Sequence, residues 1–385
     1  MRSSGPTLRY SPLVTSRTNT APPHRIGVLP GEGSGPEIVQ VALDVLEAVS
    51  RATGLAVDVE VGGPIGLDAE RDGGAPLSEP VVRFCEETFA AGGAILAGAG
   101  GGRFVYDLRR RFDLFCKLNP IRPWPELAGV SRLRRRDARD VDVLLVRENV
   151  EGAYYSEWRV AEGELAQSCT HTERGIRRIV DAAARIARSR RGELAVVVKR
   201  GGLPALAALW EDCSREVARR HDVAWIPLDV DLAAYRMVQE PEALDVVVAP
   251  NLFADILSDL GGVVAGSRAL TFGGSFSPAG HAVYQTNHGS AHDLAGRDRA
   301  NPAGQVLALA MLLRESFGCE REAELVERAL ARVWARGIRT ADLAEPGARI
   351  VGTRELGRCL TEAIHGLGAT VDEGDPVAGE ILESA

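Results

Sequence analysis

The sequence of 385 residues lacks an excess of basic charge, long apolar runs and closely spaced cysteine pairs. Basic residues do not outnumber acids: 45 lysines and arginines stand against 53 acidic residues, and this net charge of −8 argues against a nucleic-acid surface. No apolar run approaches the ~20 residues of a membrane-spanning helix, so no membrane partner is expected. The six cysteines form no Cys-x-x-Cys pair, which indicates reduced thiols in the cytoplasm rather than disulfides or a zinc site.

The two ends of the chain differ in composition from the rest. Residues 1–24 are rich in Ser, Thr, Pro and Arg and contain no Asp or Glu. A transit peptide or a disordered extension has this composition, and we favour the disordered extension. Residues 368–385 are acidic and contain several glycines, so we expect a loose tail.

Between the ends, strand-like and helix-like segments alternate. Short apolar runs typical of buried strands occur at 25–30, 94–96, 141–146, 194–198, 224–227 and 243–249. Helical patterns occur at 36–49, 174–189, 204–220, 255–264 and 302–317. This alternation predicts an α/β fold with a largely parallel sheet. No sharp linker separates the segments, so we expect any domains to be interleaved.

A glycine-rich loop, residues 31–35, separates the first strand-like run from a helix that Pro36 can begin. This position is compatible with a nucleotide-binding turn. However, the spacing is not G-x-G-x-x-G, and no acidic residue ends a clear second strand at the right distance. We therefore favour a structural turn.

Asp255 and Asp259 are one helical turn apart among apolar neighbours. Like charges at this spacing repel by roughly 0.2–0.5 kcal/mol, and apolar surroundings raise the cost of keeping them ionised. A divalent cation would remove both penalties, and carboxylate oxygens suit Mg²⁺ or Mn²⁺. From this segment alone, a helix cap with one exposed carboxylate is equally well supported.

Several segments, in this order, resemble the β-decarboxylating dehydrogenase family, which includes isocitrate, isopropylmalate, homoisocitrate and tartrate dehydrogenases. They are GEGSGPE (31–37), LRRRFDLF (108–115), RENVEGAYY (147–155), VKRGG (198–202), Asp231, NLFADILSD (251–259) and HGSAHDLAGRDRANP (288–302). The resemblance implies an isopropylmalate/isocitrate dehydrogenase-like fold with two interleaved domains and a mixed, largely parallel sheet. Residues 25–114 plus 267–367 would form a large cofactor-binding domain, and residues 115–266 a small domain with the dimer interface.

The resemblance also implies a homodimer with shared active sites and a divalent metal held by Asp255, Asp259 and, from the partner subunit, Asp231. A 2-hydroxy acid presents a hydroxyl and an adjacent carboxylate, and a bound metal would acidify that hydroxyl. Without the resemblance, Asp231 would be taken as a turn residue.

Two arginines match the family's carboxylate-binding positions, Arg109 and Arg147, and their planar forks suit that task. The competing interpretations are an ion pair of Arg109 with Asp113, and a pair of Arg147 with Glu148 or Glu151.

The sequence departs from the family at Lys117-Leu118-Asn119-Pro120, where Asn-x-Arg-Pro is usual. Because alternate residues of an extended segment share a face, the cation and the amide have exchanged places. We expect Lys117 and Asn119 to bind substrate, with Arg122 as a second candidate cation. The change predicts a substrate that differs from isocitrate and isopropylmalate near one carboxylate.

For proton transfer, Tyr154 matches the family's proton donor, and its competing interpretation is a core tyrosine. Either Lys199 or Arg200 occupies the position of the family's lysine. We favour Lys199, because its spacing to Trp210 fits the isocitrate type and arginine does not give up its proton. The asparagine expected two places after the lysine is a glycine in either register.

The cofactor segment predicts NAD rather than NADP, because Asp293 stands where the NAD-dependent branch has its ribose-binding acid. His292 replaces a usual proline, and Gln285-Thr286-Asn287 replaces the usual Glu-Pro-x. The implied cofactor-binding residues are His288, Gly289, Ser290, Ala291, Asp293 and Asn301.

Residues 100–107 match neither the adjacent leucines of the isopropylmalate branch nor the serine and asparagine of the isocitrate branch. Within this segment, Arg103 is either a reader of an extra anionic substrate group or a surface charge. Together these features predict an NAD- and Mg²⁺- or Mn²⁺-dependent oxidative decarboxylase of a 3-carboxy-2-hydroxy acid, a 3-substituted malate, in a specialised pathway. The alternative is a non-catalytic regulatory or ligand-binding subunit, against which the three retained aspartates argue.

Overall fold

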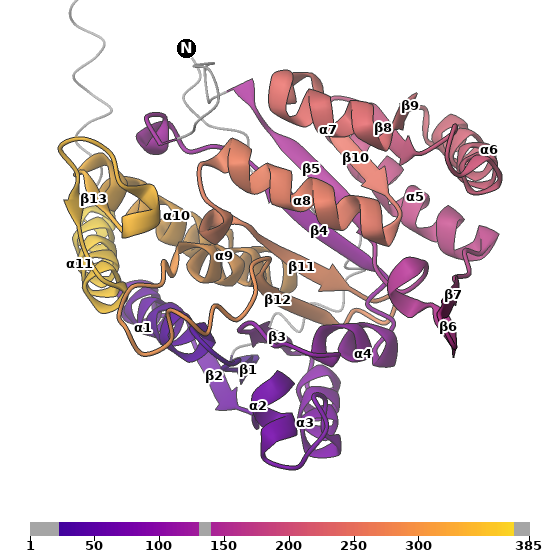
Figure 1. Ribbon diagram of the computed structural model, residues 1–385. Helices are drawn as coiled ribbons and strands as arrows, with labels where there is room; N and C mark the ends of the chain where they lie inside the picture. Colours follow the sequence, from indigo (N-terminus) through magenta and orange to yellow (C-terminus); the bar gives the residue numbers. More distant parts are fainter. Residues whose placement is uncertain (1–22, 131–139, 373–385) are drawn as a thin grey trace, which may run out of the picture.

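A computed structural model of the protein describes residues 23–130 and 140–372, with side chains as far as residue 368. Its main sheet has ten strands in the order β2-β1-β3-β12-β11-β4-β5-β10-β8-β9 (Figure 1). The strands of this sheet are β1 (His24–Leu29), β2 (Val57–Val61), β3 (Ala94–Ala97), β4 (Cys116–Ile121), β5 (Val143–Glu148), β8 (Glu193–Val198), β9 (Ala224–Asp229), β10 (Val246–Ala249), β11 (Phe272–Phe276) and β12 (Ala282–Thr286).

Two small sheets and eleven α-helices complete the described part of the chain. The small sheets pair β6 (Glu157–Ala161) with β7 (Glu164–Ser168) and β13 (Ile338–Arg339) with β14 (Arg349–Ile350). The helices are α1 (Gly35–Thr53), α2 (Gly66–Arg71), α3 (Glu79–Ala90), α4 (Phe104–Arg111), α5 (Glu173–Arg188), α6 (Pro204–His221), α7 (Val230–Gln239), α8 (Asn251–Ala265), α9 (Ala303–Phe317), α10 (Glu320–Ala335) and α11 (Thr353–Asp372).

The main sheet is mixed and mostly parallel, which confirms the predicted fold class. Antiparallel pairing is confined to its centre, where β11 pairs with β12 and β4, and β4 pairs with β5. The outer strands pair in parallel on both sides. Parallel strands need crossover helices, and the helical segments between the strand-like runs supply them.

Alternating side chains of the central strands enter different cores. In β5, Leu144 and Val146 pack with α5 and α6, whereas Val143 and Leu145 pack with α7 and α8. Both faces of this part of the sheet are therefore covered, which explains why its strands read as continuous apolar runs. Figure 1 shows α8 lying across β4 and β5. The sheet thus separates α8 from α5.

One half of the sheet uses strands from residues 24–97 and 272–286, and the other half uses strands from 116–249. The two segments that the sequence assigns to different domains thus occupy different halves of one continuous sheet. The domain division at residues 114/115 and 266/267 stays a prediction.

The predicted strand-like runs overlap β1, β3, β5, β8, β9 and β10, and the predicted helices overlap α1, α5, α6, α8 and α9. None of the predicted runs covers β2, β4, β6, β7, β11 or β12. Residues 1–22 of the predicted extension at 1–24 lie outside the described residues. His24, its last residue, is the first residue of β1. At the other end, α11 continues to Asp372, and the rest of the predicted tail lies outside the described residues.

All six cysteines are free thiols, as expected. None of the helices in the part of the chain that the structure covers has the length and apolar character needed to cross a membrane.

Candidate active site

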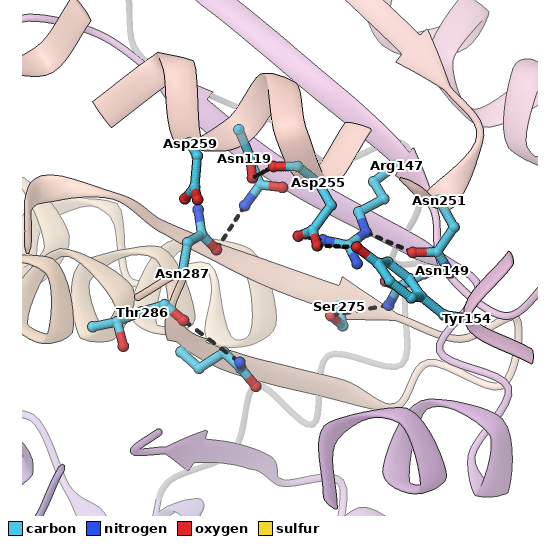
Figure 2. Close-up of polar contacts among 12 residues, drawn as sticks. Asn119, Arg147, Asn149, Tyr154, Asn251, Asp255, Asp259, Ser275, Thr286 and Asn287 are labelled. Atoms are coloured by element: carbon cyan, nitrogen blue, oxygen red, sulfur yellow. Dashed lines mark hydrogen bonds and ion pairs between the residues drawn. The ribbon is translucent and has the colours of Figure 1, made fainter. Parts of the chain in front are cut away.

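A hydrogen-bonded cluster forms at the first turns of α8, where β5 ends. Arg147 is buried and donates from Nε to Oδ1 of Asn251 at 2.9 Å and from Nη1 to Asp255. The Tyr154 hydroxyl donates to the other oxygen of Asp255 at 2.5 Å (Figure 2). Arg147 near the end of β5 and Tyr154 beyond that strand therefore converge on one carboxylate of α8. The competing pairing of Arg147 with Glu148 or Glu151 does not form.

Asp255 is ionised despite its partial burial. Burial acts to raise its pKa, but the adjacent Arg147 and the Tyr154 hydroxyl bring that pKa below its usual value. In contrast, the pKa of Tyr154 is raised, because burial and the hydrogen bond to Asp255 both favour its neutral form. Tyr154 is therefore protonated at neutral pH.

Arg109, on α4, is a buried cation whose guanidinium forms no hydrogen bond with another described residue. It is 4% exposed, and its Nε and Nη1 atoms are enclosed without a hydrogen-bond partner in the described structure. Burial and then the nearby Arg147 lower its pKa to about 10. Asp113, its competing partner, instead accepts two hydrogen bonds from Arg178. Since leaving buried donors unpaired is costly, the arrangement favours an anionic ligand.

Lys117 lies with these cations on β4 and is 3% exposed. Its pKa is well below the usual value because burial, Arg109 and Arg147 all disfavour the charged form, although Asp255 and Asp259 partly offset them. Among the described residues, Lys117 has no hydrogen-bonded side-chain partner. The site therefore holds a buried amine beside two arginines.

Asn119 contacts a second departure from the family pattern. Its Nδ2 donates to Oδ1 of Asn287 at 2.9 Å and to the Phe272 carbonyl at 3.2 Å (Figure 2). Asn287 donates to that same carbonyl at 3.1 Å. The altered motifs at 117–120 and 285–287 thus meet in space, which sequence reasoning missed. The signal in the sequence was that both motifs depart from the family pattern and that each departure includes an asparagine.

Lysine usage is a second signal that sequence reasoning overlooked. Of the 45 lysines and arginines, only two are lysines, Lys117 and Lys199, and both are candidate site residues. A chain that uses arginine for every other cation has retained an ammonium group at these two positions. Ammonium and guanidinium groups differ in that only the former releases its proton readily.

Asp259 and Asp231 lie apart from this cluster. Asp259 is one turn beyond Asp255 on the same side of α8 (Figure 2) and is 3.0 Å from Arg268. Asp231 accepts a hydrogen bond from Lys199 at 2.8 Å on an exposed part of the subunit. Within the described part of a single chain, no three acidic, His or Cys residues are placed to hold a metal. The Asp255 and Asp259 carboxylates lie one turn apart on α8, and carboxylate oxygens are suitable donors for Mg²⁺ or Mn²⁺.

Arg103 is exposed and lies beside the cluster. Its Nη1 donates to the Tyr154 carbonyl at 3.2 Å, and its guanidinium lies 5.1 Å from the ring centroid of Tyr106. The Tyr106 and Tyr154 rings are 5.2 Å apart. The segment before Arg109 therefore borders Tyr154.

The first glycine loop supports the segment predicted to bind the cofactor. The Ser34 amide donates to the Ser290 carbonyl at 2.7 Å, and the Ser290 hydroxyl donates to Glu32 at 2.6 Å. Gly33 has a positive φ, and a Cβ there would lie 2.1 Å from the Ser290 carbonyl oxygen. The loop is therefore a structural turn whose partner is the 288–291 segment.

Within that segment, the ring of His288 is neutral because burial lowers its pKa, and its Nε2 is enclosed without a partner in the described structure. Asp293 is exposed. Asn301 donates to Asp342 at 3.1 Å and accepts from the Ala303 amide at 2.9 Å, so its amide caps the start of α9. An unsatisfied ring nitrogen and an exposed acid fit an adenine nucleotide.

The mixed α/β sheet thus carries a cluster of buried ionisable side chains at the end of β5. The sequence matches the isocitrate/isopropylmalate dehydrogenase family over residues 25–360. It is 35% identical to the 3-isopropylmalate dehydrogenase of Carboxydothermus hydrogenoformans over 375 residues, covering 92% of this chain and 98% of that protein. It is 36% identical to the enzyme of that name from Geobacillus kaustophilus over 352 residues, covering 86% and 93%.

A crystal structure of isocitrate dehydrogenase from Methylococcus capsulatus superposes with a TM-score of 0.79 at 29% identity, covering 89% of this chain and 99% of that chain. The chain belongs to the isocitrate/isopropylmalate dehydrogenase family, which confirms the predicted resemblance. It is an NAD-dependent, decarboxylating oxidoreductase acting on a CH–OH group, in a family that generally uses Mg²⁺ or Mn²⁺.

Proposed function

We propose that this protein catalyses the NAD- and divalent-metal-dependent oxidative decarboxylation of a 3-substituted malate. The observation that carries the proposal is the convergence of Arg147, Asp255 and Tyr154 beside the buried guanidinium of Arg109, which lacks an anionic partner, and the buried amine of Lys117. A malate-type substrate supplies two carboxylates, which Arg109 can bind and which favour the protonated form of Lys117.

The metal would be held by Asp255 and Asp259 together with the partner subunit's Asp231. When bound, the cation supplies Lewis-acid chemistry at the substrate hydroxyl and its neighbouring carboxylate. Arg147 already orients Asp255 from one side and Asn251 holds Arg147 from the other. These contacts fix the carboxylate before ligand arrives, which reduces the ordering that binding requires.

Proton transfer is assigned to Tyr154, with Lys199 as its helper. Tyr154 would deliver its phenolic proton to the carbon that loses CO₂. Its raised pKa makes it a weak acid, so the transfer requires a strongly basic acceptor such as an enolate carbon. Lys199 pairs with Asp231, so both would enter a neighbouring subunit's site together. NAD would bind along the 288–293 segment, with Asp293 accepting from the ribose 2′-hydroxyl.

A homodimer is supported by two exposed apolar surfaces. One is on α7 and α8, where Leu232, Tyr235, Val238, Leu252, Ile256 and Val263 are exposed. The other is the β6–β7 hairpin, which exposes Trp158, Val160 and Leu165. Apolar patches of this kind are typical of protein–protein contacts.

The group at C3 of the substrate is assigned to Arg103 and its neighbour Tyr106. The names of the two relatives described above specify an isopropyl group at C3. In this chain, the Arg103 guanidinium lies 5.1 Å from the Tyr106 ring centroid, and a cation at this position favours a substituent that carries negative charge. Asn119 and Asn287 alter the site further, which supports a specialised substrate over the common ones.

The test uses purified protein with NAD⁺, Mn²⁺ and a panel of malates that carry alkyl, carboxyalkyl or phosphonoalkyl groups at C3. We expect NADH formation with at least one anionic substituent. Asp255→Asn should reduce kcat/KM by at least about 100-fold. The matched control, Asp58→Asn, removes an exposed acid from β2 and should leave turnover unchanged.

Absence of turnover with every malate, accompanied by tight binding of one of them, would instead support the alternative of a non-catalytic ligand-binding subunit. The presence of an ordered Tyr154–Asp255–Arg147 cluster argues for the enzyme, because a subunit that only binds ligand has no need of the proton donor.

A further inference from the structure

A pocket of about 790 Å³ lies against α5 and α6, and it shares no residue with the candidate active site. Its apolar lining comes from Phe115, Phe276 and Pro278. Since α5 packs on the sheet face opposite to α8, the sheet separates this pocket from the Asp255 carboxylate. We call it the arginine pocket, because its polar lining is dominated by Arg174, Arg177, Arg178, Arg185 and Arg220.

The arginine pocket is a cationic region on an acidic chain. Five arginines and two acids, Glu173 and Asp181, line it, and two further acids, Asp113 and Glu216, pair with lining arginines. The arginines therefore exceed the adjacent acids by one, on a chain whose net charge is −8. Clustered cations attract ligands of the opposite sign.

The neighbouring acids do not satisfy all of these arginines. Arg178 binds Asp113 at 2.9 Å and Arg185 binds Asp181 at 2.9 Å. Arg177 is likewise paired, with Glu173 and Glu216. Arg174 and Arg220 form no ion pair with any residue in the described ranges. The Nε atom of Arg178 is also enclosed without a hydrogen-bond partner there.

The volume of the pocket and the arginines that line it indicate the class of ligand that fits it. Its volume lies within the roughly 300–1,000 Å³ of small-molecule sites. Guanidinium groups bind phosphate and carboxylate oxygens in bidentate fashion, and several forks around one pocket suit several such groups on one ligand. The lining also joins both halves of the sheet, because Phe276 ends β11 and Ser277 and Pro278 follow it, whereas the arginines belong to α5 and α6.

We propose that the arginine pocket binds a compact polyanion bearing phosphate or carboxylate groups, at a site separate from the one that oxidises substrate. Arg174 and Arg220 supply the uncommitted charges, and Arg178 supplies an enclosed donor. The ligand then stands against Phe115, directly before the strand β4 that carries Lys117 and Asn119 on its other face.

The test is titration calorimetry on the full-length protein with pyrophosphate in one series and citrate in another, at constant ionic strength. The double variant R174Q/R220Q should lose at least about tenfold in affinity for one or both probes. The matched control is R188Q/R219Q, which removes the same charge from the same two helices at exposed positions that do not line the pocket. The control should bind as the unmodified protein does.

Equal affinity of the unmodified protein and R174Q/R220Q would overturn the proposal, because the probe would then be bound elsewhere, for instance by Arg109 and Arg147. An equal loss in R188Q/R219Q would also overturn it, since binding would depend only on net charge. Absence of binding at about 10 mM probe would do the same. The readout is binding without turnover, so its result does not depend on the proposed function.

Discussion

Burial of Lys117 lowers the stability of the folded protein. The amine is enclosed beside Arg109 and Arg147, and its pKa is well below the usual value for the reasons of burial and like charge. The unfolded chain has no such penalty, so it binds a proton that the folded protein resists. A residue that destabilises the fold in this way is more readily explained by ligand binding than by structure.

We predict that Lys117→Met stabilises the protein while impairing it. At neutral pH the melting temperature should rise by about 2 °C or more, because a side chain of similar length enters the cavity without charge. Since the depressed pKa penalises the folded state only while the unfolded lysine is protonated, the gain should shrink as pH rises toward 10.5. Calorimetric melting between pH 6 and pH 10 measures this.

The same variant should lower kcat/KM for the malate substrate by about tenfold or more, through loss of a carboxylate contact. Arg51→Met, at an exposed cation paired with Glu47, provides the control and should alter neither property appreciably. A variant that is both less stable and fully active would show that Lys117 is a structural residue.

Glu32 connects elements that are far apart in the sequence. Its buried carboxylate accepts from the Ser290 hydroxyl, the Gly101 amide at 2.8 Å and the Asp68 amide at 3.2 Å. These donors belong to the cofactor segment, the loop before Arg103 and the start of α2. Burial acts against its charge, yet the Ser290 hydroxyl and the backbone amides lower its pKa below the usual 4.5.

We therefore predict that Glu32→Gln weakens cofactor binding more than it slows the reaction. The amide retains the shape but loses the charged acceptor, so KM for NAD⁺ should rise about tenfold while kcat changes little. Glu47→Gln on the exposed side of α1 is the control. A parallel fall in kcat with an unchanged KM would refute a role in positioning the cofactor segment.

The pH dependence of this contact has a definite sign. Because the pKa of Glu32 is depressed in the folded protein, its contribution is fully present above pH 4.5 and is lost as pH falls through the folded value. Melting curves of Glu32→Gln and the unmodified protein should accordingly converge as the pH falls below 4.5.

At the scale of the whole molecule, the exposed apolar residues on α7 and α8 predict how two chains meet. Tyr235 is 62% exposed and lies one turn beyond Asp231 on α7. Burying this surface against a second chain would carry Asp231 and Lys199 toward a neighbouring site. The proposed shared active site thus makes oligomeric state and activity inseparable.

We predict that Tyr235→Glu yields a monomer of 41.1 kDa with little activity, as measured by light scattering and NADH formation. An added charge at a desolvated interface is strongly unfavourable. Val59→Glu, which alters another exposed apolar residue on β2, should remain dimeric and active. A dimeric, active Tyr235→Glu protein would place the interface elsewhere.

Mixing two inactive variants separates a shared site from a merely dimeric one. Asp231→Asn and Asp255→Asn chains, exchanged into mixed dimers, should recover activity because one of the two sites then receives both native aspartates. If each subunit held a complete site, mixing would restore nothing.

The sequence by itself determined the fold class, the family and most of the candidate residues. Periodicity predicts strands and helices because buried faces repeat at fixed spacings, and the ordered motifs place Arg147, Tyr154 and Asp255 in one candidate site. The glycine loop at 31–35 was likewise predicted as a turn, and the Gly35 amide donates to the Glu32 carbonyl at 2.8 Å within it. These features depend on local patterns that a linear chain can display.

Only the tertiary structure decided which candidates meet. In the structure Asn119 donates to Asn287, and Asp113 accepts from Arg178 rather than from Arg109. Asp231 accepts from Lys199 and lies apart from Asp255 within one chain. The fold also brought arginines of α5 and α6 against the turn that follows β11. These hydrogen bonds join residues 32 to 168 positions apart, and their geometry follows from strand order and helix packing. Spacing along the chain therefore could not reveal them.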